Sequence, residues 1–180
     1  MKYFALFILF IPNIILGQDS PESVLKKLGH NPLLIVDSIK IQNGSLLDYD
    51  VYTIASISIL IDTTAQKTYG AEAKSGAIIV ETNAFARKNY ISFFRHISSE
   101  YDSIYTLHES DSAFQYFLND NILKEHYFGY LSAVNDDTFI SLEILNDKQL
   151  QEKYSIHDKQ FGILIKSKRP SHLVGDDKKY

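Results

Sequence analysis

Two stretches of this chain share one order of strand, helix, turn and strand, and this repeat is the strongest constraint on the fold. Residues 57–82 read ISILIDTTAQKTYGAEAKSGAIIVET, and residues 142–168 read LEILNDKQLQEKYSIHDKQFGILIKSK. The matched pairs are Asp62 with Asp147, Gln66 with Gln151, Tyr69 with Tyr154, Lys74 with Lys159 and, after a one-residue insertion, Gly76 with Gly162. Because the helix start, the helix end and the second strand recur together, we expect one α+β design to be folded twice.

Each copy is preceded by further strand signals. Residues 33–36 form a buried-strand run, and Ile39 and Ile41 alternate with polar neighbours as a half-exposed strand does. A short helix is expected from Asp48 or Asp50 to about residue 55, with Val51 and Ile54 facing inward. The second copy is expected to have strands at 114–118, 122–123, 142–145 and 162–165, a turn at 119–121, a helix or turn opening at 136–137, and a helix at 149–154.

An aromatic segment lies between the copies. Its apolar positions are spaced three and four apart, as in an amphipathic helix that ends near residues 98–99; they are Phe85, Tyr90, Ile91, Phe93, Phe94 and Ile97. The polar residues 100–112, with Ile104, Tyr105 and Leu107 as anchors, are interpreted as a connector. The expected fold is therefore α+β, with two β-β-α-β-α-β subdomains joined by an amphipathic helix.

The first residues have the pattern of a secretory signal peptide. Lys2 supplies a positive charge, residues 3–16 are almost all apolar, and Gly17-Gln18 opens a polar stretch. We expect cleavage near Gly17-Gln18, and an uncleaved membrane anchor is the alternative. The expected organisation is a signal peptide at 1–17, a first subdomain at 18–83 that opens with a helix at 20–29, a connecting helix and loop at 84–112, a second, degenerate subdomain at 113–168, and a flexible tail at 169–180.

Charge and cysteine content restrict the partners. The formal net charge is −4 at pH 7, which argues against nucleic acid, because phosphates require a basic surface. The chain has no cysteine, so it contains neither a disulfide framework nor a thiolate site.

The first copy resembles the plug domain of TonB-dependent outer-membrane receptors. The resemblance rests on four motifs in order: residues 31–37 (NPLLIVD), 54–60 (IASISIL), 68–70 (TYG) and 76–80 (GAIIV). It departs from the family pattern at Ser38, at 61–62 and, in the second copy, at Tyr154-Ser155. The resemblance implies a plug-like fold without the β-barrel, so transport is not implied for this chain.

No pattern predicts catalysis, a metal or a cofactor. The six histidines are scattered without metal-ligand spacing, and nucleophile-elbow and phosphate-loop motifs are missing. The binding residues proposed from the sequence are Tyr69, Tyr90, Phe93 and Phe94, although core packing explains the same residues. Exposure of these rings would mark a docking surface.

Three functions follow as hypotheses. The first is an exported, non-enzymatic, plug-like interaction module of the bacterial cell envelope, not itself a transporter. It would be periplasmic or outer-membrane associated in a gram-negative bacterium, with no spanning segment after signal cleavage. Its partner would be another envelope or outer-membrane protein, bound by strand addition at an open sheet edge. The alternative is a periplasmic small-molecule or peptide binder that uses the cleft between the halves, and a hydrolase with an unrecognised site is the third.

Overall fold

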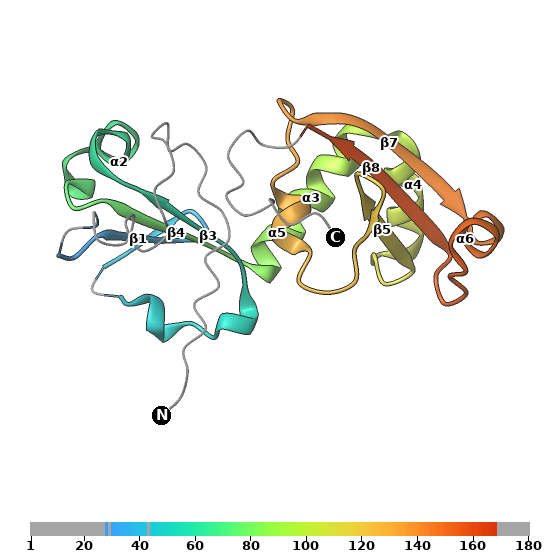
Figure 1. The fold of residues 1–180 in the computed structure, drawn as a ribbon, viewed down its shortest axis with the longest axis horizontal. Helices are drawn as coiled ribbons and strands as arrows, with labels where there is room; N and C mark the ends of the chain where they lie inside the picture. Colours follow the sequence, from blue (N-terminus) through green and yellow to red (C-terminus); the bar gives the residue numbers. More distant parts are fainter. Residues whose placement is uncertain (1–27, 29, 43, 169–180) are drawn as a thin grey trace, which may run out of the picture. The chain divides into compact units, whose positions relative to one another are not determined.

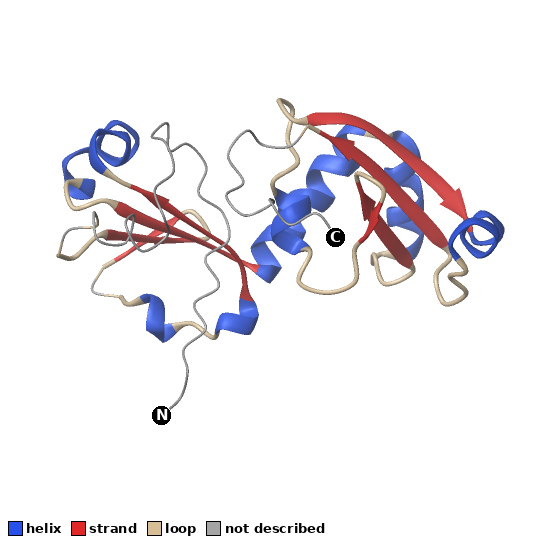
Figure 2. Cartoon of the chain, in the orientation of Figure 1, coloured by secondary structure: helices blue, strands red, loops and turns tan. Residues whose placement is uncertain are grey.

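The computed structural model describes residues 28, 30–42 and 44–168 of the chain. The signal peptide, most of the helix expected at 20–29 and the tail at 169–180 lie outside these residues. The chain divides between Asn83 and Ala84 into two units, each built on a four-stranded mixed sheet with helices (Figures 1 and 2). The α+β class with two similar subdomains is therefore confirmed.

The first unit forms a sheet with the strand order β2-β1-β4-β3. Strand β1 is parallel to β4, and the other neighbouring strands are antiparallel. Its elements are β1 (Leu33–Val36), β2 (Ile39–Ile41), the 3₁₀ turns η1 (Leu46–Asp48) and η2 (Val51–Thr53), β3 (Ile54–Leu60), α2 (Asp62–Tyr69), η3 (Gly70–Ala73) and β4 (Ala77–Thr82).

The second unit repeats this plan with the strand order β6-β5-β8-β7. Strand β5 is parallel to β8, and the other neighbouring strands are antiparallel. Its elements are α3 (Asn83–Ile97, beginning one residue before the division), α4 (Ser99–His108), β5 (Phe114–Leu118), β6 (Asn121–Ile122), α5 (Phe128–Ser132), β7 (Phe139–Asn146), α6 (Asp147–Tyr154) and β8 (Phe161–Ser167).

The register of the two sheets corrects one matched pair of the sequence repeat. Leu60 lies opposite Ala77, and Leu145 lies opposite Gly162, so Gly162 occupies the position of Ala77 without any insertion. Both sheets also contain a register shift at the start of the third strand, at Ile54/Ser56 and at Phe139/Ser141. Gly76 is instead a turn residue with φ 90°, where glycine avoids backbone strain.

The hairpin turns of the two units are also equivalent. Asp37 and Ser38 have φ 50° and 69°, and Asn119 and Asp120 have φ 49° and 70°. The Asp37 carboxylate accepts hydrogen bonds from the backbone amide and the hydroxyl of Thr82, both at 2.8 Å. The Asn119 side-chain oxygen accepts one from the Ser167 amide at 2.9 Å. Asn and Asp tolerate positive φ better than most residues, which explains the turn without the glycine of the plug pattern.

One face of each sheet packs against the short helix between the third and fourth strands. In the first unit the interface is made of small residues, because Ala65 of α2 and Ala77 of β4 are both fully buried. In the second unit Leu150 of α6 is fully buried and packs over Gly162. A large residue on the helix is thus combined with the smallest residue on the strand, which preserves packing density.

The opposite faces are covered differently. In the second unit an aromatic layer from α3, α4 and α5 packs against β5, β7 and β8 (Figure 1). In the first unit the described side chains that pack on the equivalent face come mainly from Leu28, Leu46 and Tyr49.

The structure differs from the sequence expectation in residues 84–112. These residues were expected to join the subdomains, but they belong to the second unit. The region interpreted as a polar connector contains α4, whose Tyr101 is fully buried, whereas the expected anchor Leu107 is 77% exposed. Ser98 accepts a hydrogen bond from the Tyr101 amide and caps this helix, which makes a polar sequence helical.

One local expectation in the first unit is also wrong. The helix expected after Asp48 or Asp50 is a pair of 3₁₀ turns, and Val51, expected to face inward, is 57% exposed.

Candidate functional site

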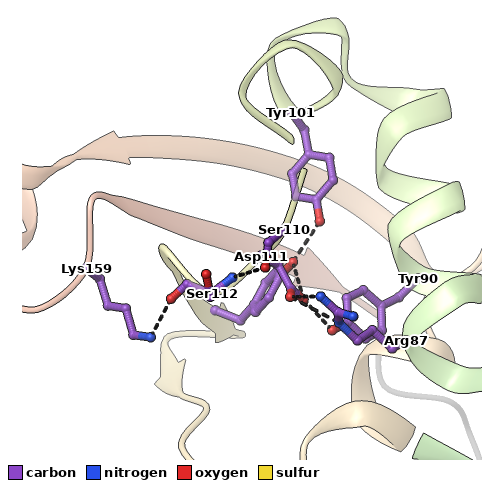
Figure 3. Close-up of polar contacts among 8 residues, drawn as sticks. Arg87, Tyr90, Tyr101, Ser110, Asp111, Ser112 and Lys159 are labelled. Atoms are coloured by element: carbon purple, nitrogen blue, oxygen red, sulfur yellow. Dashed lines mark hydrogen bonds and ion pairs between the residues drawn. The ribbon is translucent and has the colours of Figure 1, made fainter. Parts of the chain in front are cut away.

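The densest cluster of polar side chains in the described residues surrounds Asp111 in the second unit (Figure 3). Asp111 lies in the loop between α4 and β5 and is only 8% exposed. Its Oδ1 accepts hydrogen bonds from the Nε of Arg87, at 3.1 Å, and from one terminal nitrogen of the same guanidinium. Its Oδ2 accepts one from the Tyr90 hydroxyl at 2.8 Å. Two residues from α3, one helical turn apart, therefore fix this carboxylate.

Tyrosine hydroxyls extend the cluster into the core. The Tyr116 hydroxyl lies 3.4 Å from Asp111 Oδ2 and 2.7 Å from the Tyr101 hydroxyl. Burial raises the pKa of Tyr90, Tyr101 and Tyr116 far above the usual range, and the Asp111 charge adds to this increase for all three. The hydrogen bond to Asp111 raises the pKa of Arg87 further above its already high value. The phenols are therefore neutral and the guanidinium charged at physiological pH.

Backbone contacts hold the loop around Asp111. Lys159 Nζ donates to the Ser112 carbonyl at 2.7 Å, and the Ser110 hydroxyl accepts from the Ser112 amide at 3.1 Å (Figure 3). The Ala113 carbonyl accepts from the amides of residues 160 and 161, just before and at the start of β8. The loop is thus attached to α3 through side chains and to β8 through the backbone.

This arrangement favours a structural role over a chemical one. Arg87, Tyr90 and Tyr116 surround the Asp111 oxygens, and neutral phenols with raised pKa are poor nucleophiles. In the described part of the chain, no buried side-chain nitrogen or oxygen lacks a hydrogen-bond partner. A satisfied network of this kind is costly to disturb and fixes one packing arrangement. We interpret the Asp111 cluster as an anchor between α3, α4 and β5.

Among the described residues, no three His, Asp or Glu side chains are placed to hold a metal ion. Within the same residues, no helix has the length and apolar character needed to cross a membrane.

The residues proposed for binding from the sequence lie in two places. Tyr69 is half-buried at the end of α2, where it packs against the cluster of Leu60 and Ala65. Tyr90 and Phe94 are 1% and 0% exposed, and Phe93 packs edge-on against Phe139 at 5.9 Å between ring centroids. The structure thus brings together the three residues of α3 as core aromatics and places Tyr69 in the other unit.

Sequence reasoning missed Asp111 and Arg87 because neither occurs in a recognisable motif. The useful signal is in α4, where Tyr101, Ile104, Tyr105 and His108 follow the three-and-four spacing of an amphipathic helix. Recognising that helix would have placed residues 109–113 in a short loop facing α3. The burial of Asp111 could still not have been predicted, since it depends on tyrosines from two helices and a strand.

Each unit also has a hollow among its described residues. A cavity of about 580 Å³ in the first unit borders β1 and β2, and the ion pair between Lys40 and Glu72 lies at it. A groove of about 470 Å³ in the second unit lies along α3, with Tyr105 of α4 in its lining.

Comparison of the chain with protein-family models, with curated proteins and with solved structures finds no match.

Proposed function

We propose that this chain is an exported, non-enzymatic interaction module of the bacterial cell envelope with a plug-like fold. Its partner is another envelope or outer-membrane protein, which adds a strand to the outer edge of β3, the edge that pairs with no other described strand. The observation that carries the proposal is that β3 is a long sheet edge without a charged residue. Such an edge presents unpaired backbone groups to a second chain.

The edge strands differ in how well they are protected. Strand β2 has three residues and includes Lys40, and β6 has two residues. Strand β7 has eight residues, but it carries the exposed Glu143. Strand β3 has seven residues, IASISIL, and Ser58 occupies the position of Glu143 in the shared register. Charges and short length are the usual protections against edge pairing, so β3 is the unprotected one among the edge strands of the described residues.

An exposed apolar segment leads directly into β3. Leu47, Val51 and Tyr52 are 74%, 57% and 74% exposed. This segment is held in place, because the Asp50 carboxylate accepts a hydrogen bond from the Tyr52 amide at 3.0 Å and Asn83 donates to the Tyr52 carbonyl at 2.8 Å. A partner strand on β3 would cover apolar side chains that otherwise face water, which supplies a hydrophobic contribution to binding.

Site-specific crosslinking in envelope fractions tests the proposal. A photoreactive phenylalanine at position 52 should capture a partner, and the same group at Leu107, an equally exposed residue of the second unit, should not. Ser58→Glu introduces the charge that protects β7, so it should abolish the crosslink from position 52. The matched exchange Glu143→Ser should leave it unchanged.

Thermal unfolding of each variant separates loss of binding from loss of folding. A crosslink that persists in Ser58→Glu, or that forms equally from both positions, would contradict strand addition at β3. Failure to capture any protein from position 52 would remove the support for an interaction module at this surface.

A further inference from the structure

The groove of about 470 Å³ on the second unit combines cations with an apolar floor. It is lined by Arg87, Lys88, Ile91, Ser92 and Arg95 of α3, and by Tyr105 of α4. We call this feature the basic groove. The basic groove contains three cations, although the formal net charge of the chain is −4. The position of these charges therefore indicates a ligand of opposite sign.

The basic groove has only a small excess of positive charge. Arg87 is paired with the buried Asp111, and Arg95 is paired with Asp102, whose side chain is 45% exposed. Lys88 has no ion pair among the described residues, so the groove has an excess of about one positive charge. A membrane surface or a nucleic acid is bound through many cations acting together, each contributing about 1 kcal/mol at an anionic surface. This groove has too few free charges for such a ligand.

Both guanidinium groups are held in position before a ligand binds. The Arg95 guanidinium lies over the Tyr105 ring, 5.2 Å from its centroid, and one terminal nitrogen contacts the Thr106 hydroxyl at 3.3 Å. The hydrogen bonds of Arg87 use its Nε and one terminal nitrogen. Within the described residues, the other terminal nitrogen of each guanidinium has no acceptor. Fixed arginines with unused donors bind carboxylates at a low entropic cost.

The spacing of the cations defines the shape of the ligand. Lys88 and Arg95 are separated by about 10 Å along the axis of α3, at about 1.5 Å per residue. A peptide in the polyproline II conformation has three residues per turn and a rise of about 3.1 Å per residue, so side chains three residues apart lie on the same side, about 9 Å from each other. Ile91 lies between the two cations on the helix and contributes an apolar floor with Tyr105.

We propose that the basic groove binds a peptide segment in the polyproline II conformation, with two carboxylates three residues apart and an apolar residue between them. One carboxylate contacts Arg87 and Lys88, the other contacts Arg95, and the apolar side chain lies on Ile91 and Tyr105. This site is in the second unit and uses side chains, so it is independent of strand addition to β3 in the first.

A fluorescent peptide with the core Glu-Leu-Ser-Glu, blocked at both ends, tests the proposal by polarisation with the full chain. Arg95→Gln should weaken binding about tenfold, which corresponds to losing one charge-assisted contact, and Lys88→Glu should weaken it by at least that much, because it also adds a repulsive charge. Lys153→Glu, an exposed lysine of α6, makes the same charge change as Lys88→Glu outside the groove and should leave binding unchanged. A peptide with glutamine in place of both glutamates should not bind.

Three outcomes would overturn the proposal. The first is no binding of the glutamate peptide at millimolar concentration. The second is equal weakening by Lys88→Glu and Lys153→Glu, which would indicate only net charge. The third is binding to phosphatidylglycerol vesicles, lost in Lys88→Glu, without peptide binding, which would assign the groove to a lipid. None of these results depends on Ser58, so the two proposals fail separately.

Discussion

The two units of this protein share a topology but differ in how their sheets are covered. Strand order, register, the irregularity in the third strand and the positive-φ hairpin turn are the same in both. The second unit covers one sheet face with the aromatic layer of α3, α4 and α5 and anchors it through Asp111. The difference indicates that backbone topology tolerates large changes in packing when sizes at contacting positions change together.

The largest expected change in stability comes from substitutions at the contact between the short helix and the sheet. Leu150→Ala should destabilise the second unit by about 3 kcal/mol, because it removes a fully buried leucine. Gly162→Ala should cost about 1–3 kcal/mol, since its Cβ would lie 2.6 Å from Leu150 Cδ2. The double variant recreates the Ala65 and Ala77 pair of the first unit, and alanine at 150 leaves space for the new methyl group.

A double-mutant cycle in chemical denaturation measures this coupling. We expect the double variant to be clearly more stable than the sum of the single variants predicts. Strict additivity would show that the two positions are not equivalent to the pair in the first unit.

The second prediction concerns the anchor that distinguishes the second unit. Asp111→Ala should lower the free energy of unfolding by about 3 kcal/mol, because it removes the acceptor of Arg87 and of two buried hydroxyls. Asp102→Ala breaks an exposed ion pair with Arg95 and should cost less than about 1 kcal/mol. Urea denaturation of both variants tests the difference, and equal losses would contradict the anchoring role.

The third prediction concerns how the stability of the second unit depends on pH. The folded second unit holds the phenolic protons of Tyr90, Tyr101 and Tyr116 more tightly than the unfolded chain, because burial raises the pKa of all three. Their contribution to stability is complete below about pH 10, the ordinary tyrosine pKa, and is lost as the pH rises above it. The loss should approach about 1.4 kcal/mol per pH unit for each tyrosine.

Tyrosinate absorption and circular dichroism, recorded together during alkaline titration, follow this loss. Tyr90→Phe removes one of the buried titrating groups and should make the pH dependence of stability less steep. Ionisation of these tyrosines near pH 10 in a chain that remains folded would contradict their burial.

The smallest expected change in stability comes from exchanging the residues that end α2 and α6. Gly70 and Ser155 follow the last helical tyrosine in each copy, with φ 78° and 57°. Ser155→Gly should stabilise the protein by about 0.5–1 kcal/mol, because glycine adopts positive φ without strain. Gly70→Ser should be destabilising although a Cβ there would meet no atom within 4 Å. Thermal unfolding measures both changes, and a neutral Gly70→Ser would show that backbone strain is not the cause.

Much of the fold followed from local sequence signals. The repeat, most of the strands, the aromatic helix and the cap of α6 depend on residues near one another in the chain. Asn146, for example, accepts a hydrogen bond from the Gln149 amide, as a polar residue before a helix does. Short-range hydrogen bonds and side-chain periodicity decide such features, so the sequence alone predicts them.

Contacts between segments that are distant in the sequence decided the rest of the fold and the candidate site. The sequence could not show that residues 84–112 pack on the second sheet, that Asp111 is buried by Arg87 and Tyr90, or that Val51 and Leu107 face water. It also paired Gly162 with Gly76, whereas strand pairing makes Gly162 equivalent to Ala77. Burial and register depend on which side chains make contact across the core. These contacts join residues that are far apart in the sequence, so local sequence patterns do not predict them.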